Sequence, residues 1–165
     1  VLPSGNLGFR NDFNYKGINL GFMFSARFGG VVLSQTQAIM DQFGVSETTA
    51  IARDNGGVPV NNGVIDAQAY YTKVGGSNGL LEDYVYDATN LRLQELSLGY
   101  TLPAKWFNDA VKINLSVVGR NLWMIYCKAP FDPESVATTG NYYQGIDYFM
   151  MPSLRSVGFN LKLKF

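Results

Sequence analysis

Histidine is absent from this sequence of 165 residues, and cysteine occurs once, at Cys127. Without histidine, acid–base chemistry based on imidazole and metal sites built from histidine are excluded. A single cysteine cannot form a disulfide within the chain. No histidine can activate Cys127 as a nucleophile either, so we interpret it as a packing residue at the end of a strand.

Charge is also scarce, because charged residues make up 16% of the chain and 13 basic residues balance 13 acidic ones. The zero net charge leaves no basic surface of the kind that binds nucleic acid, so no nucleic-acid partner is expected. No run of 18 apolar residues is present, and therefore no transmembrane helix is predicted. The first residues, Val-Leu-Pro-Ser, have no features of a signal peptide, and we interpret the chain as part of a longer protein.

Aromatic residues (14%) and glycine (18 copies) are frequent, which favours antiparallel β structure with long loops. The clearest pattern is in the last residues, where apolar and polar side chains alternate strictly. The apolar set is Val157, Phe159, Leu161, Leu163 and Phe165, and the polar set is Ser156, Gly158, Asn160, Lys162 and Lys164. This period of two predicts a strand whose apolar face meets lipid and whose polar face meets a wet lumen.

Four other segments alternate in the same way, and strands are predicted at 5–15, 18–28, 91–102, 111–126 and 154–165. Tyr15-Lys16-Gly17 forms a short turn between the first two. Leu91 and Leu93 are out of phase with the rest of their strand, so either a bulge lies near Gln94 or the strand leaves the membrane there.

Two long outer loops are predicted at 29–90 and 128–151. The first is expected to contain short helices at 35–43 and at 47–53, the second capped by Ser46. The stretch 58–86 has no clear period and is predicted to lack regular structure, with the glycine-rich part after Val74 as a flexible tip. Loops of this length are usually functional.

Five strands cannot close a barrel, and bacterial single-chain barrels have an even number, at least eight. The predicted fold is therefore all-β: a segment of an antiparallel up-and-down transmembrane β-barrel with long extracellular loops. With the chain end on the periplasmic side, both short turns fall on that side and both long loops fall outside.

Several motifs resemble those of SusC/RagA-type TonB-dependent outer-membrane transporters. The segment Leu91–Pro103 (LRLQELSLGYTLP) is similar to their LRLxxLxLGYxLP sequence, and Ser116–Trp123 (SVVGRNLW) is similar to their GxNL strand. Phe131–Glu134 (FDPE) resembles their DPE loop, and the last residues from Pro152 resemble their final strand. The early turn at Tyr15-Lys16-Gly17 agrees as well, so the resemblance covers most of the chain.

The resemblance implies that the chain is the last five strands of a roughly 22-stranded barrel in the bacterial outer membrane. It implies TonB-energised uptake of glycans or peptides, together with a SusD-like surface lipoprotein. TonB would act through an N-terminal plug that this sequence does not contain. It also implies that Phe165 is a terminal aromatic assembly signal, read by the outer-membrane assembly machinery.

Tyrosines are the candidate contact residues of the outer loops for an oligosaccharide, a peptide or the lipoprotein, because aromatic faces stack on sugars and anchor interfaces. They are Tyr70, Tyr71, Tyr84, Tyr86, Tyr142 and Tyr143. The alternative interpretation is that they pack the loops against each other.

Asp132, Glu134 and Asp147 are the acidic candidates in the second loop. Catalysis by the Asp132–Glu134 pair is not predicted, because Pro133 and the loop setting favour turn chemistry. A loop Ca²⁺ held by Asp132 or Asp147 is the alternative, since carboxylates suit that ion. No other cofactor is expected, and we predict that the chain is not an enzyme.

A soluble carbohydrate-binding β-sandwich is the competing prediction. It would account for the alternation and the loop tyrosines, but not for the apolar final strand. Dependence on detergent separates the two, because a sandwich stays soluble without it.

Overall fold

The computed structural model describes residues 2–103, 105, 111–137, 140 and 144–164, and the chain divides into two compact units. The sheet unit contains residues 3–29, 89–130 and 153–165. The insertion unit contains residues 30–88 and 131–152, with the first two residues of the chain.

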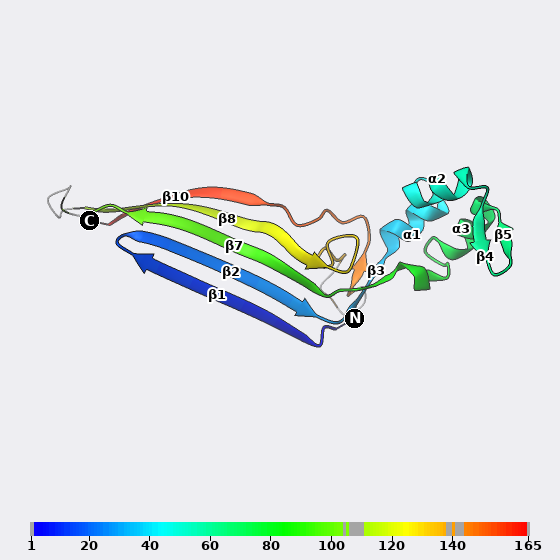
Figure 1. Ribbon diagram of the computed structural model, residues 1–165, viewed down its shortest axis with the longest axis horizontal. Coiled ribbons are helices and arrows are strands. Elements are labelled where there is room, and N and C mark those ends of the chain that lie inside the picture. Colours follow the sequence, from blue (N-terminus) through cyan, green and yellow to red (C-terminus); the bar gives the residue numbers. More distant parts are fainter. Residues whose placement is uncertain (1, 104, 106–110, 138–139, 141–143, 165) are drawn as a thin grey trace. The chain divides into compact units, whose positions relative to one another are not determined.

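The sheet unit is one antiparallel sheet of five long strands (Figure 1). The strands are β1 (Gly5–Tyr15), β2 (Ile18–Phe28), β7 (Asn90–Thr101), β8 (Lys112–Cys127) and β10 (Ser156–Lys164). They pair in chain order, β1-β2-β7-β8-β10, and every pair is antiparallel. The sequential antiparallel pairing predicted from the alternation is therefore confirmed.

The turn between β1 and β2 consists of two residues, Lys16 and Gly17, because Tyr15 pairs directly with Ile18. Both have positive φ, 48° for Lys16 and 89° for Gly17. Two successive residues with positive φ form a type I′ turn, whose twist matches that of the flanking strands. A side chain at Gly17 would place a Cβ 2.8 Å from the carbonyl oxygen of Thr101, so glycine is required for space as well as for conformation.

A β-bulge lies at Gln94, which decides between the two alternatives for this strand. Phe22 pairs with Leu96, and Phe24 pairs with Leu93, so one extra residue on β7 is accommodated between these pairs. Since Phe22 and Phe24 point to the same face, the bulge brings Leu93 back to the face of Leu96. The strand continues to Asn90 with its apolar face unbroken.

Rows of paired residues across the sheet show that its two faces differ in chemistry. One row contains Phe13, Leu20, Leu98, Val117 and Phe159, and the adjacent row contains Asn14, Asn19, Gly99, Ser116 and Asn160. Adjacent rows point to opposite faces. Leu161 follows on the apolar face and Lys162 on the polar face, as the alternation predicts.

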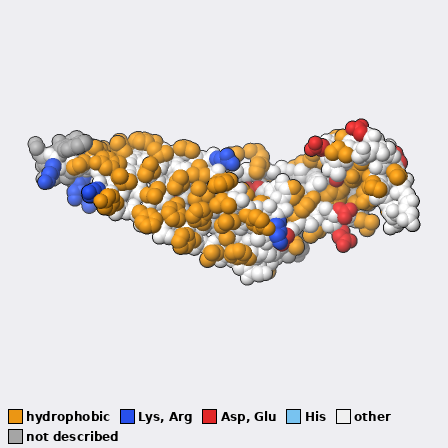
Figure 2. Space-filling model, in the orientation of Figure 1, with side chains coloured by type: hydrophobic (Ala, Val, Ile, Leu, Met, Phe, Trp, Pro, Cys, Tyr) orange, Lys and Arg blue, Asp and Glu red, His pale blue; other side chains and the backbone are white. Residues whose placement is uncertain are grey.

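The apolar face of the sheet is open to its surroundings. Phe159 is 68% exposed, and the other members of its row are also exposed. Figure 2 shows hydrophobic side chains spread across the visible face of the sheet unit. Among the described residues of this unit, Ala26 and Ala129 are the only buried hydrophobic ones. The sheet unit thus lacks the packed core that a soluble β-sandwich has between its two sheets.

The insertion unit combines short helices and short strands. Its elements are β3 (Val31–Ser34), α1 (Gln35–Gln42), α2 (Glu47–Asp54), β4 (Val58–Val60), β5 (Gly63–Ile65), α3 (Ala67–Val74), the 3-10 helix η1 (Leu81–Tyr84), β6 (Val85–Asp87) and β9 (Ile146–Asp147). The predicted helices at 35–43 and 47–53 are confirmed. The prediction that 58–86 lacks regular structure is wrong, because α3, a β4–β5 hairpin and β6 lie there. The unit also contains a parallel pair, β3 with β9.

Each of the three α-helices of the insertion unit begins at a side-chain cap. The side chains of Ser34, Ser46 and Asp66 accept hydrogen bonds from the backbone N–H groups of Gln37, Thr49 and Ala69. Such caps satisfy N–H groups that have no partner within the helix. The Asp66 cap is the local signal in the sequence that marks the start of α3.

The glycines after α3 are packed against α1 and do not form the flexible tip that was predicted. Gly75 and Gly76 are buried, and the N–H of Gly76 donates to the carbonyl of Ala38 at 2.8 Å. A Cβ at Gly75 would lie 2.6 Å from the Ala38 oxygen, so a side chain does not fit. The contact brings α3 close to α1 and helps to bury Ala38, Val74 and Tyr84, the core of the unit.

None of the helices in the described part of the chain is both long enough and apolar enough to span a membrane.

The bulge predicts that two single-residue deletions in β7 have opposite effects. Deleting Gln94 removes the extra residue and leaves Leu93 on the apolar face, so the protein should still fold. Deleting Ser97, which lies in the regular part of the strand, moves the residues on one side of the gap to the wrong face. Folded yield should then fall sharply, as measured by circular dichroism and protease resistance. Equal yields for the two deletions would contradict the assignment of the bulge.

Candidate functional site

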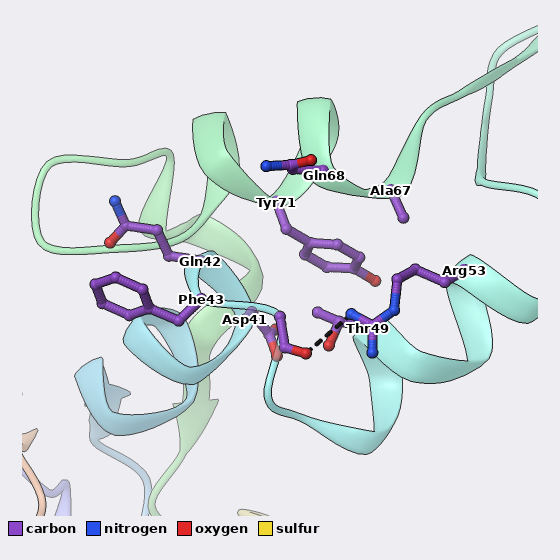
Figure 3. A pocket seen from close by; sticks show the side chains of 9 residues that line it. Asp41, Gln42, Phe43, Thr49, Arg53, Ala67, Gln68 and Tyr71 are labelled. Atoms are coloured by element: carbon purple, nitrogen blue, oxygen red, sulfur yellow. Dashed lines mark hydrogen bonds between the residues drawn. The ribbon is translucent and has the colours of Figure 1, made fainter.

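A cavity of about 190 Å³ lies among the three helices of the insertion unit (Figure 3). The end of α1, the loop after it, α2 and the start of α3 supply its walls. The lining residues are Asp41, Gln42, Phe43, Gly44, Thr49, Arg53, Ala67, Gln68 and Tyr71. Charged, amide, hydroxyl and aromatic groups therefore surround one small space.

Arg53 is held in position by the loop that follows α1. Its Nη1 donates a hydrogen bond of 2.9 Å to the carbonyl oxygen of Gly44. Gly44 has a φ of 68°, a left-handed conformation that ends α1 and turns the chain toward α2. A Cβ at Gly44 would lie 2.9 Å from Nη1 of Arg53. The glycine thus provides both the conformation and the space that let the guanidinium group line the cavity.

Asp41 is the most deeply buried charged group of the cavity wall, with a relative exposure of 2%. Its Oδ2 accepts a hydrogen bond of 3.0 Å from the hydroxyl of Tyr84. Its Oδ1 is buried and has no hydrogen-bond partner within the described part of the chain. An unsatisfied buried oxygen is costly, and native structures contain few of them.

The pKa of Tyr84 is raised well above its ordinary value by burial, and then by its hydrogen bond to Asp41 and by the negative charge of that residue. The phenol therefore stays protonated and remains a donor to the carboxylate at physiological pH. Tyr84 belongs to the core of the unit, where it packs with Ala38 and Val74. Its burial favours the packing role for this tyrosine.

Tyr70 and Tyr71 lie side by side on α3, with ring centroids 5.1 Å apart and the planes nearly perpendicular. Burial raises the pKa of Tyr71, and the nearby charge of Asp41 raises it further, so the Tyr71 hydroxyl is neutral in the cavity. Tyr71 is half-buried and extends into the cavity from α3 (Figure 3). Tyr70 packs beside the core of the unit, and its hydroxyl lies 3.5 Å from Oδ2 of Asp83.

Tyr86 is the remaining candidate tyrosine among the described residues, and it makes packing contacts and a hydrogen bond. The hydroxyl of Tyr86 donates to Oε1 of Gln37 at 2.7 Å, and its ring packs edge-on against Phe131 with centroids 5.7 Å apart. Tyr142 and Tyr143 lie outside the described residues. The structure thus brings Tyr70, Tyr71, Tyr84 and Tyr86 into the insertion unit, and among these four only Tyr71 lines the cavity.

The acidic candidates of the second loop make structural hydrogen bonds. Oδ1 of Asp132 accepts from the backbone N–H of Glu134 at 3.1 Å, which is the turn chemistry that Pro133 indicated. Asp147 is buried and accepts from the hydroxyl of Ser34 at 3.1 Å. The described residues contain no cluster of three or more His, Cys, Asp or Glu side chains that could hold a metal ion. A Ca²⁺ at Asp132 or Asp147 stays a prediction, and Phe165 lies outside the described residues.

Replacing Tyr84 by Phe should destabilise the insertion unit. The change removes the hydrogen bond to Oδ2 of Asp41, whose Oδ1 already has no donor within the described part of the chain. Leaving this buried carboxylate without a donor should cost about 1–3 kcal/mol. Hydrogen exchange of the α1 and α3 backbone amides in the intact protein measures this local stability. Replacing Tyr70 by Phe is the matched control, because its long hydroxyl contact is exposed. Unchanged protection in the Tyr84→Phe variant would contradict the structural role of this hydrogen bond.

The polar face of the sheet unit carries a second set of interacting charges. Nε of Arg120 lies 3.3 Å from Oε2 of Glu95, and Arg10 pairs with Asp12 at 2.9 Å. A shallow hollow of about 490 Å³ lies on this face, and the charged residues that line it are Arg10, Glu95 and Lys162. Polar and charged side chains thus concentrate on the face opposite the apolar rows.

The chain is similar in sequence to a TonB-dependent receptor and in fold to a chain of a peptide importer. It is 29% identical over 171 residues to the TonB-dependent receptor P3 of Formosa agariphila, a match that covers 99% of this chain and 16% of that receptor. Its fold matches a chain of the RagAB peptide importer in the "open-open" state, with a TM-score of 0.71 and 21% identity, over 100% of this chain and 17% of that one. No protein-family model matches the chain.

The chain spans about one sixth of the length of each protein that it matches. Both matches extend over essentially its entire length, and the structural match includes the five-stranded sheet and the insertion. The resemblance identified from the sequence motifs is confirmed by these findings, because the chain is similar over its whole length to part of a TonB-dependent receptor.

Proposed function

We propose that the chain forms part of the barrel wall and of the external recognition region of an outer-membrane importer of the SusC/RagA type. The observation that carries the proposal is the five-stranded antiparallel sheet with one exposed apolar face and one charged face. In a bilayer, lipid covers the apolar face, while the polar face borders a hydrated lumen. The importer is energised by TonB through parts of the protein outside this sequence.

The strand lengths support this assignment. The five strands contain 11, 11, 12, 16 and 9 residues. A tilted strand needs about 9–11 residues to cross the hydrocarbon core. Each strand is therefore long enough to span the membrane, and the two longest extend beyond it. The five strands are the last five of a closed barrel of roughly 22 strands, and Phe165 serves barrel assembly.

The two segments of the insertion unit, 30–88 and 131–152, form the recognition region in this proposal. Loops supported by a rigid scaffold usually carry binding residues. Both segments connect strands at the same end of the antiparallel sheet, which we assign to the cell exterior. There they contact a SusD-like lipoprotein and the oligosaccharide or peptide cargo, with Tyr142 and Tyr143 among the contact residues. No catalytic role is proposed for any residue.

The alternative, a soluble carbohydrate-binding sandwich, requires a second sheet or another cover over the apolar face. Large apolar patches on soluble monomers rarely exceed a few hundred Å². Here the exposed apolar rows extend across all five strands. The open face therefore supports the membrane assignment over the soluble one.

The membrane assignment predicts a large difference between two neighbouring substitutions in β10. Phe159→Arg places a charge on the face that meets lipid, whereas Asn160→Arg places the same charge on the lumen face. An arginine on the lipid side costs about 2–4 kcal/mol near the bilayer midplane. The yield of folded protein in the outer-membrane fraction should fall for Phe159→Arg and stay near normal for Asn160→Arg. Equal yields would contradict the proposed orientation of the sheet.

The recognition role predicts that the first segment of the insertion unit, residues 31–87, can be removed without loss of the barrel. The N–H of Ala88 donates to the carbonyl of Gly30 at 3.0 Å, so the two ends of the insertion are adjacent. Replacing residues 31–87 by two glycines should leave the strand pairing intact, with normal surface levels but reduced uptake. Normal uptake at normal surface levels would contradict a role of residues 31–87 in recognition.

A further inference from the structure

We propose that Arg92 and Asn121 form a side-chain latch that holds Ser153 and Leu154 against the sheet and thereby selects the register of the last strand, β10. The latch lies within the sheet unit, and only its consequence for a closed barrel rests on the proposed function. Its parts come from three motif segments of the sequence: Leu91–Pro103, Ser116–Trp123 and the residues from Pro152 onward.

Arg92 is the donor at the centre of the latch. It lies on β7 and is buried, with a relative exposure of 2%. Its Nη1 donates to Oδ1 of Asn121 at 2.6 Å and to Oγ of Ser153 at 3.1 Å. A buried guanidinium group is costly unless its N–H groups are hydrogen-bonded. The position of Ser153, just before β10, is therefore coupled to the burial of a charge on a strand two places away in the sheet.

Asn121 holds the backbone of the same segment. Its Nδ2 donates to the carbonyl oxygen of Ser153 at 2.8 Å, with a longer contact of 3.4 Å to the carbonyl oxygen of Leu154. The φ of Asn121 is 53°, a left-handed conformation that asparagine tolerates better than most residues. One amide group thus receives the Arg92 guanidinium on its oxygen and fixes the chain before β10 with its nitrogen.

The latch lies where the backbone ladder between β8 and β10 ends. Within the described residues, the last pair of this ladder is Ser156 with Arg120, although β8 continues to Cys127. Asn121 follows Arg120 directly in the chain. Its side chain therefore holds the segment before β10 at the point where backbone pairing stops.

The alternation of apolar and polar side chains does not select this register by itself. A shift of one residue would turn β10 over, but a shift of two residues returns every side chain to its own face. In the observed register, Phe159 pairs with Val117 and Leu161 with Leu115. After a shift of two toward the end of β8, Phe159 would pair with Gly119 and Leu161 with Val117. The apolar row would remain apolar.

Charge opposes the observed register. Lys164 lies directly opposite Lys112, and like charges in directly opposed positions are destabilising. The same shift of two would place Lys164 opposite Asn114 instead. An interaction outside these pairs therefore selects the observed register. The latch provides it, because the shift would move Ser153 by about 7 Å along β8 and break its hydrogen bonds to Arg92 and Asn121.

The register of β10 has a consequence for the proposed barrel. The stagger of a closed barrel is set by the registers of all its strands together. A shift of β10 by two residues would change this stagger, so the latch favours correct closure.

Disulfide crosslinking in the full-length protein tests the register, after replacement of the native Cys127 by serine. Asn160→Cys with Ser116→Cys reports the observed register. Asn160→Cys combined with Val118→Cys or with Asn114→Cys reports a shift of two in either direction. Directly opposite residues are close enough for a disulfide, whereas diagonal neighbours are about 7–8 Å apart and are not. With the latch intact, only the 160–116 crosslink should form.

Asn121→Gly is the decisive variant, because glycine adopts the left-handed φ and only the side chain is lost. The yield of a shifted crosslink relative to the 160–116 crosslink should rise about fivefold or more, as expected for lost side-chain hydrogen bonds. Asn61→Gly is the matched control. Asn61 also has a left-handed φ, 52°, but it lies between β4 and β5 in the insertion unit, so this variant should leave the crosslinks unchanged.

Asn121→Asp is the second variant, and it decides the test if Asn121→Gly does not assemble. It keeps an acceptor for Arg92 but loses the donor to the Ser153 carbonyl, so it should also raise the shifted crosslink. Lys164→Glu should reverse the effect of Asn121→Gly. It turns the repulsion with Lys112 into an attraction that exists only in the observed register.

Three results would overturn the inference. In the first, the assembled Asn121 variants form only the 160–116 crosslink. In the second, Asn61→Gly shifts the register as strongly as Asn121→Gly. In the third, Lys164→Glu fails to restore the 160–116 crosslink in the Asn121→Gly protein. None of these results affects the importer proposal, which the Phe159→Arg and Asn160→Arg pair tests separately. A failure of the membrane assignment would likewise leave the crosslinks readable, because they report strand pairing and not location.

Discussion

In-register pairing of five antiparallel strands is the constraint on which the rest of this structure depends. Residues that pair across the sheet lie on the same face, so a single apolar row extends from Phe13 to Phe159. A shift of one residue in any strand would place its apolar side chains among the charges of the opposite face. The bulge at Gln94 illustrates this constraint. It makes the backbone of β7 irregular, but it keeps Leu93 on the apolar face. The environment of the two faces thus excludes shifts of one residue.

The insertion unit depends on different physics. Its three α-helices contain eight residues each, too short to be stable alone, and they rely on side-chain caps and on mutual packing. The close approach of Gly75 and Gly76 to α1 brings α3 near α1, and burial of Tyr84 joins η1 to both. The same packing buries Asp41, so the stability of the unit and the chemistry of its cavity share one hydrogen bond, from Tyr84 to Asp41.

The two units are proposed to have different functions. The sheet unit exposes a regular apolar surface that suits a lipid environment, and its polar face carries a shallow hollow. The insertion unit concentrates acceptors, donors and an aromatic ring in a cavity of about 190 Å³. A scaffold of paired strands tolerates variation in such an insertion, because the ends of the insertion meet at Gly30 and Ala88.

The strands, their order and the two faces of the sheet were determined by the sequence alone, because a period of two is a local property that each segment carries. The first two helices were also predictable from local signals, because Gly44 marks the end of α1 and Ser46 caps the start of α2. The choice between a bulge and a departure from the membrane near Gln94, the existence of α3 and the packing of Gly75 were decided by tertiary structure, where contacts with other elements outweigh weak local preferences. The cavity was decided there as well. Asp41, Arg53 and Tyr71 are distant in the chain and share no motif, and only the packing of three short helices places them around one space.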